Sequence, residues 1–103
     1  MGELRLVRLR YTKPALDDLK DIAGYLDPRS PSGARQVRHR VKSLIEQLCD
    51  QPFLGKRTED PTIRRLTAVP YPYLIFYEVT EEDIIIHAVR HAARNPSSMP
   101  RRT

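Results

Sequence analysis

The sequence predicts an α+β fold with the element order β-α-α-β-β-β, in which a helical hairpin packs on one face of a mainly antiparallel four-stranded sheet. Two neighbouring segments in the first half of the chain repeat apolar residues at three- and four-residue spacing, as amphipathic helices do. Three later segments are short, apolar and closely linked, which is typical of an antiparallel meander. The 103 residues suffice for one compact domain around one core.

The first element is a strand expected within residues 5–11, where apolar residues alternate with arginine. A slip in this alternation indicates a bulge, or a strand that begins only near Val7. A helix follows from Thr12, whose hydroxyl can accept from the free N–H groups, while Pro14 is tolerated in the first turn. The Asp-Pro pair at 27–28 ends this helix, because the residue before a proline disfavours helical backbone.

A second helix begins after Ser30, with Pro31 in its first turn, and its apolar stripe continues to Leu48. Because the joint between the helices is short, the two should fold back on each other as an antiparallel hairpin. The polar face of the second helix carries Arg35, Arg38, Arg40 and Lys42. These cations can reach a nucleic acid, although a charged helix face is more often simply solvated.

Three strands are predicted after a turn at 52–55 and a polar loop at 56–61. The strands cover 63–69, Tyr73–Val79 and 84–90. Sequential strands with short links pair in antiparallel fashion. The first strand is distant in sequence, so it can join the sheet only by returning beside the meander after the helical hairpin. The apolar faces of the helices then have one face of the sheet to cover.

Residues 1–95 are expected to form a single domain, and residues 96–103 a flexible C-terminal tail. Lys and Arg outnumber Asp and Glu by 18 to 13, which gives a formal net charge of +5. Such a balance favours an acidic partner, either nucleic acid or protein. The single cysteine cannot form an internal disulfide, and the first residues lack the apolar core of a signal peptide, so we expect a cytoplasmic protein.

Three motifs carry a resemblance to a known family. They are D-x-x-x-Y-L at 21–26, L-x-x-x-P-x-L-G at 48–55, and a Y-L-I-F-Y-x-V strand at 73–79 followed by V-x-H-x-A-R at 89–94. In this order and at these separations, the chain from about residue 11 to 95 resembles the ParE branch of the RelE/ParE toxins. The resemblance implies the toxin of a bacterial type II toxin–antitoxin system, which arrests growth when its labile antitoxin is degraded.

The resemblance leaves two targets open, because ParE-like members are described as blocking DNA gyrase, whereas RelE-like members cut messenger RNA on the ribosome. RNA cleavage by 2′-OH attack needs a base, an acid and cations around the phosphate. The resemblance places a nuclease arginine at Leu74, which cannot neutralise a phosphate, and the His-Tyr pair of some nucleases at Ala92 and Ala93. We therefore expect a ParE-like gyrase inhibitor that is not an enzyme. The alternative is a RelE-like, ribosome-dependent mRNA endoribonuclease.

Candidate site residues follow from the same comparison. If the chain is a nuclease, the catalytic candidates are Glu59, Arg65, Arg90 and His91. Candidates for binding the target or the antitoxin are Arg64, Arg65, Tyr73, Tyr77, Arg90, His91 and Arg94. Arg64 and Arg65 are adjacent on a strand, so only one can share a surface with Arg90. The alternative is a solvated strand edge, where basic residues discourage aggregation. Strand tyrosines likewise fill a half-buried sheet surface more often than they stack on bases.

The last predicted strand should alternate between the two faces of the sheet. This alternation predicts His87, Val89 and His91 on one face, and Ile84, Ile86 and Ala88 on the other. Histidines at positions i and i+4 of a strand lie about 13 Å apart, too far to share a metal ion without other ligands. We therefore expect neither a metal nor another cofactor. Cys49 adjoins an apolar stripe and is expected to be buried or half-buried, not nucleophilic.

The central strand at Tyr73–Val79 is almost continuously apolar, whereas a sheet covered on one side should alternate more cleanly. We expect a partner to cover the second face or an adjoining groove. The family resemblance implies that this partner is a cognate antitoxin with a DNA-binding N-terminus and an acidic C-terminal segment that wraps the toxin as a helix and an added strand. A homodimer through the same surface is the alternative.

Overall fold

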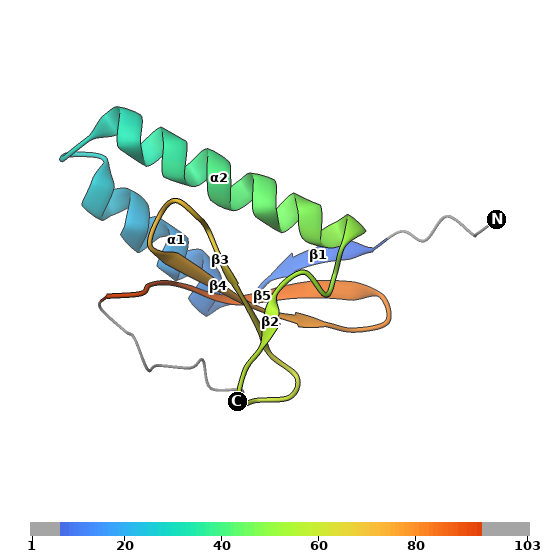
Figure 1. Cartoon of the computed structure of the whole chain (residues 1–103). Helices are drawn as coiled ribbons and strands as arrows, with labels where there is room; N and C mark the ends of the chain where they lie inside the picture. Colours follow the sequence, from blue (N-terminus) through green and yellow to red (C-terminus); the bar gives the residue numbers. More distant parts are fainter. Residues whose placement is uncertain (1–6, 94–103) are drawn as a thin grey trace.

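The computed structural model describes residues 7–93, in which a helical hairpin lies over one face of a sheet (Figure 1). The elements are β1 (Arg8–Tyr11), α1 (Lys13–Leu26), α2 (Pro31–Asp50), β2 (Lys56–Arg57), β3 (Arg64–Thr67), β4 (Tyr73–Val79) and β5 (Asp83–His91). This two-layer arrangement confirms the predicted α+β class and the helical hairpin. The predicted tail at 96–103 and the candidate Arg94 lie outside the described residues.

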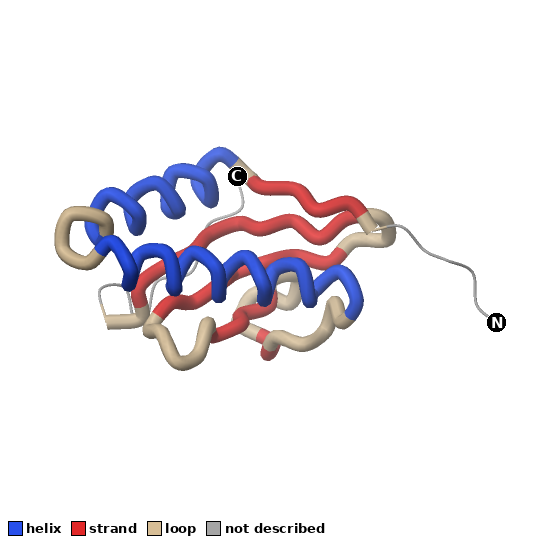
Figure 2. The backbone as a smooth tube through the Cα atoms, turned by 90° about the horizontal axis from the view of Figure 1, so that it is seen from above, coloured by secondary structure: helices blue, strands red, loops and turns tan. Residues whose placement is uncertain are grey.

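The sheet has the strand order β1-β5-β4-β3-β2, with β1 parallel to β5 and every other pair antiparallel. Figure 2 shows the strands side by side behind the helices. The first strand therefore returns beside the meander, as expected. The prediction of four strands was wrong by one, because the polar loop expected at 56–61 contains β2. Two charged residues have no apolar alternation to detect, and β2 exists only through its pairing with Arg64 and Arg65 of β3.

Both helices begin at the caps that the sequence predicts. The Thr12 hydroxyl accepts from the Ala15 N–H at 3.2 Å, and the Ser30 hydroxyl accepts from the Gly33 N–H at 3.1 Å. A proline occupies the first turn of each helix, where its missing N–H costs nothing. Neither helix within residues 7–93 is long and apolar enough to cross a membrane.

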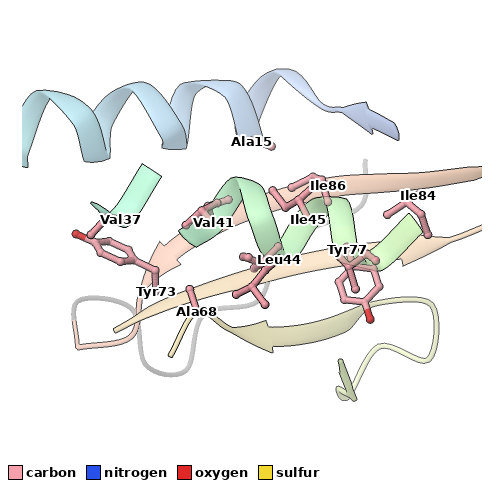
Figure 3. Close-up of a cluster of buried hydrophobic side chains, with 13 residues drawn as sticks. Ala15, Val37, Val41, Leu44, Ile45, Ala68, Tyr73, Tyr77, Ile84 and Ile86 are labelled. Atoms are coloured by element: carbon pink, nitrogen blue, oxygen red, sulfur yellow. The ribbon is translucent and has the colours of Figure 1, made fainter. Parts of the chain in front are cut away.

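The main hydrophobic core lies between the hairpin and the sheet (Figure 3). The buried stripe of α2 meets the row of β4 side chains that points towards the helices. The members of this core are Ala15, Val37, Val41, Leu44, Ile45, Leu48, Ala68, Tyr73, Ile75, Tyr77, Ile84, Ile86 and Val89. One face of the sheet is therefore fully used by the helices, and the opposite face, which we call the open face, presents the alternate residues.

A bulge in β5 changes which residues reach the open face. Tyr77 pairs with Ile86 but Phe76 pairs with Ala88, so His87 is an extra residue on β5. Beyond this point the alternation is reversed, and Val89 lies in the core with Ile84 and Ile86. The predicted division of β5 was therefore wrong after His87. No glycine marks the bulge, so the sequence pattern could not reveal it.

Candidate functional site

The register of the sheet places two basic residues on the open face. Arg65 of β3 pairs with Phe76, which pairs with Ala88, and one step along the sheet Leu74 pairs with Arg90. Since residues that face each other across strands share one side of the sheet, Arg65 and Arg90 both belong to the open face. This resolves the choice between Arg64 and Arg65 in favour of Arg65.

The centre of the open face is apolar. A second buried cluster consists of Ile63, Leu74, Phe76 and Ala88, with Ala92 packed against it. Leu74 is 9 % exposed and pairs directly with Arg90. The middle of this face therefore holds a hydrophobic cluster where a phosphate-cleaving site would need converging cations.

Beside this cluster lies an acid–imidazole pair that the sequence reading missed. His87 Nε2 lies 2.9 Å from Glu78 Oε1, and the side chains are 16 % and 15 % exposed. The bulge brings His87 to the partner strand within reach of Glu78. Glu78 is the one charged residue in the otherwise apolar strand β4. A charged residue at such a position was the only hint in the sequence that a polar partner lies beside it.

The predicted candidate His91 is held by contacts with Tyr73 and with the backbone of Ala93. Its ring contacts Tyr73 edge-on, with the centroids 5.2 Å apart, and its Nδ1 accepts from the Ala93 N–H at 3.1 Å. Tyr73 itself is a buried core residue. His91 therefore does not converge with His87, which is partnered on the open face.

Arg64 and Tyr77 tie the turn after α2 to the sheet. Arg64 Nη1 donates to the Gly55 carbonyl at 2.8 Å, and its guanidinium lies 4.8 Å from the centre of the exposed Phe53 ring. The buried Tyr77 hydroxyl donates to the Pro52 carbonyl and accepts from the Gly55 N–H, both at 2.8 Å. Burial raises the pKa of Tyr77. These two candidates therefore hold the L-x-x-x-P-x-L-G turn in place.

Two further predictions concern single side chains. Glu59 is exposed in the loop between β2 and β3 and makes no hydrogen bond or ion pair with another of residues 7–93. It does not join the Glu78–His87 pair. Cys49 is half-buried as predicted, and burial raises the pKa of its thiol, which disfavours the reactive thiolate. The part of the chain that the structure describes holds no group of three or more His, Cys, Asp or Glu suited to a metal ion.

The two helices spread apart from their joint (Figure 2). An apolar groove lies between them. Its volume is about 240 Å³. The lining residues are Tyr11, Leu19, Ile22, Ala23, Leu26, Ala34, Val37, Arg38, Val41, Lys42 and Ile45. Two of them, Arg38 and Lys42, are basic and lie on the α2 side of the groove. Arg38 Nη1 lies 3.8 Å from Asp27 Oδ1. The groove therefore offers an apolar floor with a basic rim.

A polar cleft of about 270 Å³ lies where α1 meets the last part of β5. Asp18, Asp21, Tyr73, Arg90 and His91 contribute to its lining. Burial raises the pKa of Asp18, while the hydrogen bond from the Val89 N–H and the nearby charge of Arg90 act against that rise. The cleft mixes both signs of charge, which distinguishes it from the apolar groove.

Comparison with known proteins identifies the family. The family model described as "ParE toxin of type II toxin-antitoxin system, parDE" matches residues 9–96. Toxin RelE2 of Caulobacter vibrioides is 36 % identical over 89 residues, which cover 86 % of this chain and 99 % of that protein. The match therefore extends over nearly the whole length of the relative.

Two solved structures share the fold. One belongs to the chromosomal ParDE toxin–antitoxin system from P. aeruginosa, with a TM-score of 0.74 and 21 % identity over 84 % of this chain and 96 % of that one. The other is a mutant of the E. coli toxin RelE in the free state, with a TM-score of 0.66 and 17 % identity over 88 % of each chain. The chain belongs to the ParE toxin family of type II toxin–antitoxin systems, within the RelE/ParE superfamily.

Proposed function

We propose that this toxin arrests growth by inhibiting DNA gyrase and that it acts by binding, without catalysis. The observation that carries the proposal is the position of Leu74 at the apolar centre of the open face, paired with Arg90. In the ribonuclease branch of the family, this position is expected to hold an arginine. A leucine supplies no charge to a phosphate, so the centre of this face lacks the cation that RNA cleavage needs there.

The alternative, RNA cleavage on the ribosome, is favoured by a different observation. The Glu78–His87 pair provides an imidazole that a carboxylate orients, which suits general acid–base chemistry. Arg65 and Arg90 lie on the same face. The name of the relative from Caulobacter vibrioides points in the same direction. Both targets lie in the bacterial cytoplasm, so either proposal places the toxin there.

The proposed partner is a cognate antitoxin, and the groove between α1 and α2 suits its neutralising segment. An amphipathic helix can bury its apolar side chains against Leu19, Ile22 and Val41. Acidic residues along the same helix then meet Arg38 and Lys42 at the rim. The likeness to the ParDE toxin–antitoxin system supports this assignment.

One experiment separates the two targets. The chain is expressed from a tightly controlled promoter in a sensitive host, and DNA breaks with SOS induction are scored beside cleavage of messenger RNA. We expect DNA damage without specific message cleavage, and loss of supercoiling activity when purified toxin is added to gyrase. Message cleavage that disappears in both Arg90→Ala and His87→Ala would overturn the proposal and establish the nuclease. Absence of any growth effect would contradict both functions.

A further inference from the structure

A third hollow, which we call the α2 cleft, lies on the flank of α2 that faces away from the apolar groove. It has a volume of about 430 Å³ and is formed by the first half of α2 and the loop between β3 and β4, which rises beside the helix (Figure 1). Its lining residues are Ser32, Arg35, Gln36, His39, Arg40, Pro70 and Tyr71. No carboxylate is among them.

The basic side chains of the α2 cleft have no acidic partner within residues 7–93. Arg35 and His39 make neither a hydrogen bond nor an ion pair with any residue between 7 and 93. Arg40 uses only its Nε, which donates to the Val69 carbonyl at 2.8 Å. The terminal nitrogens of this guanidinium therefore remain available to an oxygen acceptor from outside the described chain.

Some other basic residues of the described chain pair with acids. Arg8 and Arg10 lie 2.9 Å and 3.5 Å from the carboxylate of Asp83. Lys13 lies 3.4 Å from Asp17 on the next turn of α1. The α2 cleft differs from these places, because it brings together three basic side chains, at positions 35, 39 and 40, that have no acidic partner among residues 7–93.

Two hydrogen bonds connect the walls of the cleft. The bond from Arg40 to the Val69 carbonyl joins α2 to the loop, and the Tyr71 hydroxyl donates to Gln36 Oε1 at 3.3 Å. Holding these groups in place reduces the conformational entropy that binding would otherwise cost. The positive end of the α2 dipole lies near Ser32 and adds to the attraction for an anion.

We propose that the α2 cleft binds the phosphate backbone of duplex DNA. Two permanent guanidinium charges and an imidazole lie within one helical turn and a half, at positions 35, 39 and 40, and all three side chains line the cleft. Arginine side chains and helix N-termini are common phosphate contacts in protein–DNA complexes. The cleft offers polar contacts to the backbone without an arrangement for reading base edges, so binding is independent of sequence.

Single-stranded nucleic acid and acidic proteins fit the cleft less well. Binding to single strands uses exposed aromatic rings, and here the Tyr71 ring is half-buried and tied to Gln36 by its hydroxyl. An acidic amphipathic helix can pack on the apolar floor of the groove on the other flank of α2. The α2 cleft has no leucine, isoleucine or valine among its lining residues. Because the two hollows lie on opposite flanks, an occupied groove leaves the cleft accessible.

The inference deepens the proposed function, because gyrase works on DNA, but its test contains no gyrase and therefore fails or succeeds separately. The full chain is titrated into a fluorescent 20-base-pair duplex of arbitrary sequence, and fluorescence anisotropy is recorded between 50 and 200 mM salt. In a plot of the logarithm of the binding constant against the logarithm of the salt concentration, each phosphate contact contributes roughly −0.9 to the slope. We expect the double variant Arg35→Gln/Arg40→Gln to lower the magnitude of that slope by about 2 and the affinity at least tenfold. Since Arg40→Gln also removes the bond to Val69, Arg35→Gln alone serves as the variant that breaks no internal contact, with a slope change of about 1.

The matched control removes two cations elsewhere. Lys20→Gln/Arg57→Gln changes the net charge equally at side chains that have no partner within residues 7–93, and it should keep affinity within twofold. An equal loss in the control would overturn the site, because net charge alone would then explain binding. Polyglutamate that competes as well as DNA would assign the cleft to an acidic protein. An RNA duplex or a single strand bound tenfold more tightly would overturn the choice of duplex DNA.

Discussion

The carboxylate of Asp18 accepts a hydrogen bond from the backbone N–H of Val89 at 3.0 Å, although the two residues are 71 positions apart. Strand β1 pairs with β5 only as far as Ile86. Beyond that point the edge of β5 loses its strand neighbour, and α1 supplies a side-chain acceptor instead. The contact therefore joins the first helix to the last strand, next to the reversal caused by the bulge at His87.

The Asp18–Val89 contact predicts different effects for two substitutions. Asp18→Ala leaves the N–H of the buried Val89 without an acceptor and should lower the free energy of unfolding by about 1–3 kcal/mol. Asp18→Asn keeps a carbonyl oxygen at this place and should lose less than Asp18→Ala. Chemical denaturation at pH 7 measures both. Equal losses in the two variants would mean that charge, and not the acceptor, matters here.

The same residue predicts a pH dependence. Burial raises the pKa of Asp18 in the folded chain above its ordinary value of 3.8, so its protonated form is favoured by folding. The resulting stability is fully present below pH 3.8 and is lost as the pH rises through the raised value. The free energy of unfolding of the wild type relative to Asp18→Asn should therefore decrease between pH 3 and pH 6. A difference that grows with pH would contradict the raised pKa.

Position 55 requires glycine, because the strand backbone and the Tyr77 ring lie too close to leave room for a side chain. A Cβ built there would lie 2.8 Å from the Arg65 carbonyl and 2.8 Å from the Tyr77 ring, with no flexible group to yield. Gly55→Ala should therefore cost about 1–3 kcal/mol in the free energy of unfolding, as overpacking does. Gly24→Ala is the matched control, since nothing lies within 4 Å in helix α1, and it should raise stability by about 0.5–1 kcal/mol. Thermal and urea unfolding of both variants decide the question.

The Tyr77 hydroxyl satisfies two backbone groups of the turn at once. Tyr77→Phe leaves the Gly55 N–H and the Pro52 carbonyl without this partner and should cost about 1–3 kcal/mol. Because burial raises the pKa of Tyr77, its phenolate should form only above the ordinary value of 10, which ultraviolet titration of the wild type against Tyr77→Phe can detect. If the wild type shows a tyrosinate signal below pH 10 that Tyr77→Phe lacks, the pKa of Tyr77 is not raised and this prediction is wrong.

The apolar groove predicts a variant that separates toxicity from neutralisation. Ala23 lines the groove, so Ala23→Lys fills it with a long charged side chain and should weaken antitoxin binding at least a hundredfold. Leu16→Lys is the control, because Leu16 is 46 % exposed on the same helix and does not line the groove. Isothermal titration with the cognate antitoxin measures both. Tight binding by Ala23→Lys would move the antitoxin to another surface.

Periodicity and caps predicted most of the fold. Thr12 and Ser30 cap the helices as expected, and β4 spans the predicted residues. These elements could be predicted because capping residues and apolar runs are local patterns in the sequence. The strand β2 and the bulge at His87 were missed, since each depends on which strand lies beside it and neither changes the local pattern. Pairing between distant segments is what a single sequence shows least directly.

The candidate site was predicted less well than the fold. The choice between Arg64 and Arg65 needed the register of β3 against β4, and it assigned one arginine to the turn and the other to the open face. Tyr73 and Tyr77 were placed among binding residues because they are polar aromatics, yet both are buried in the core. Glu78 was overlooked because its partner, His87, reaches it only through the bulge.

The parallel pairing of β1 with β5 has a consequence for how the toxin is made. Arg8 reaches Asp83, 75 residues later, so the edge of the sheet cannot close until the last strand has left the ribosome. A nascent chain that lacks β5 also lacks Ile84, Ile86 and Val89, which form much of the floor beneath the helices. The sheet edge and the core beneath the helices can therefore be completed only after β5 has been synthesised.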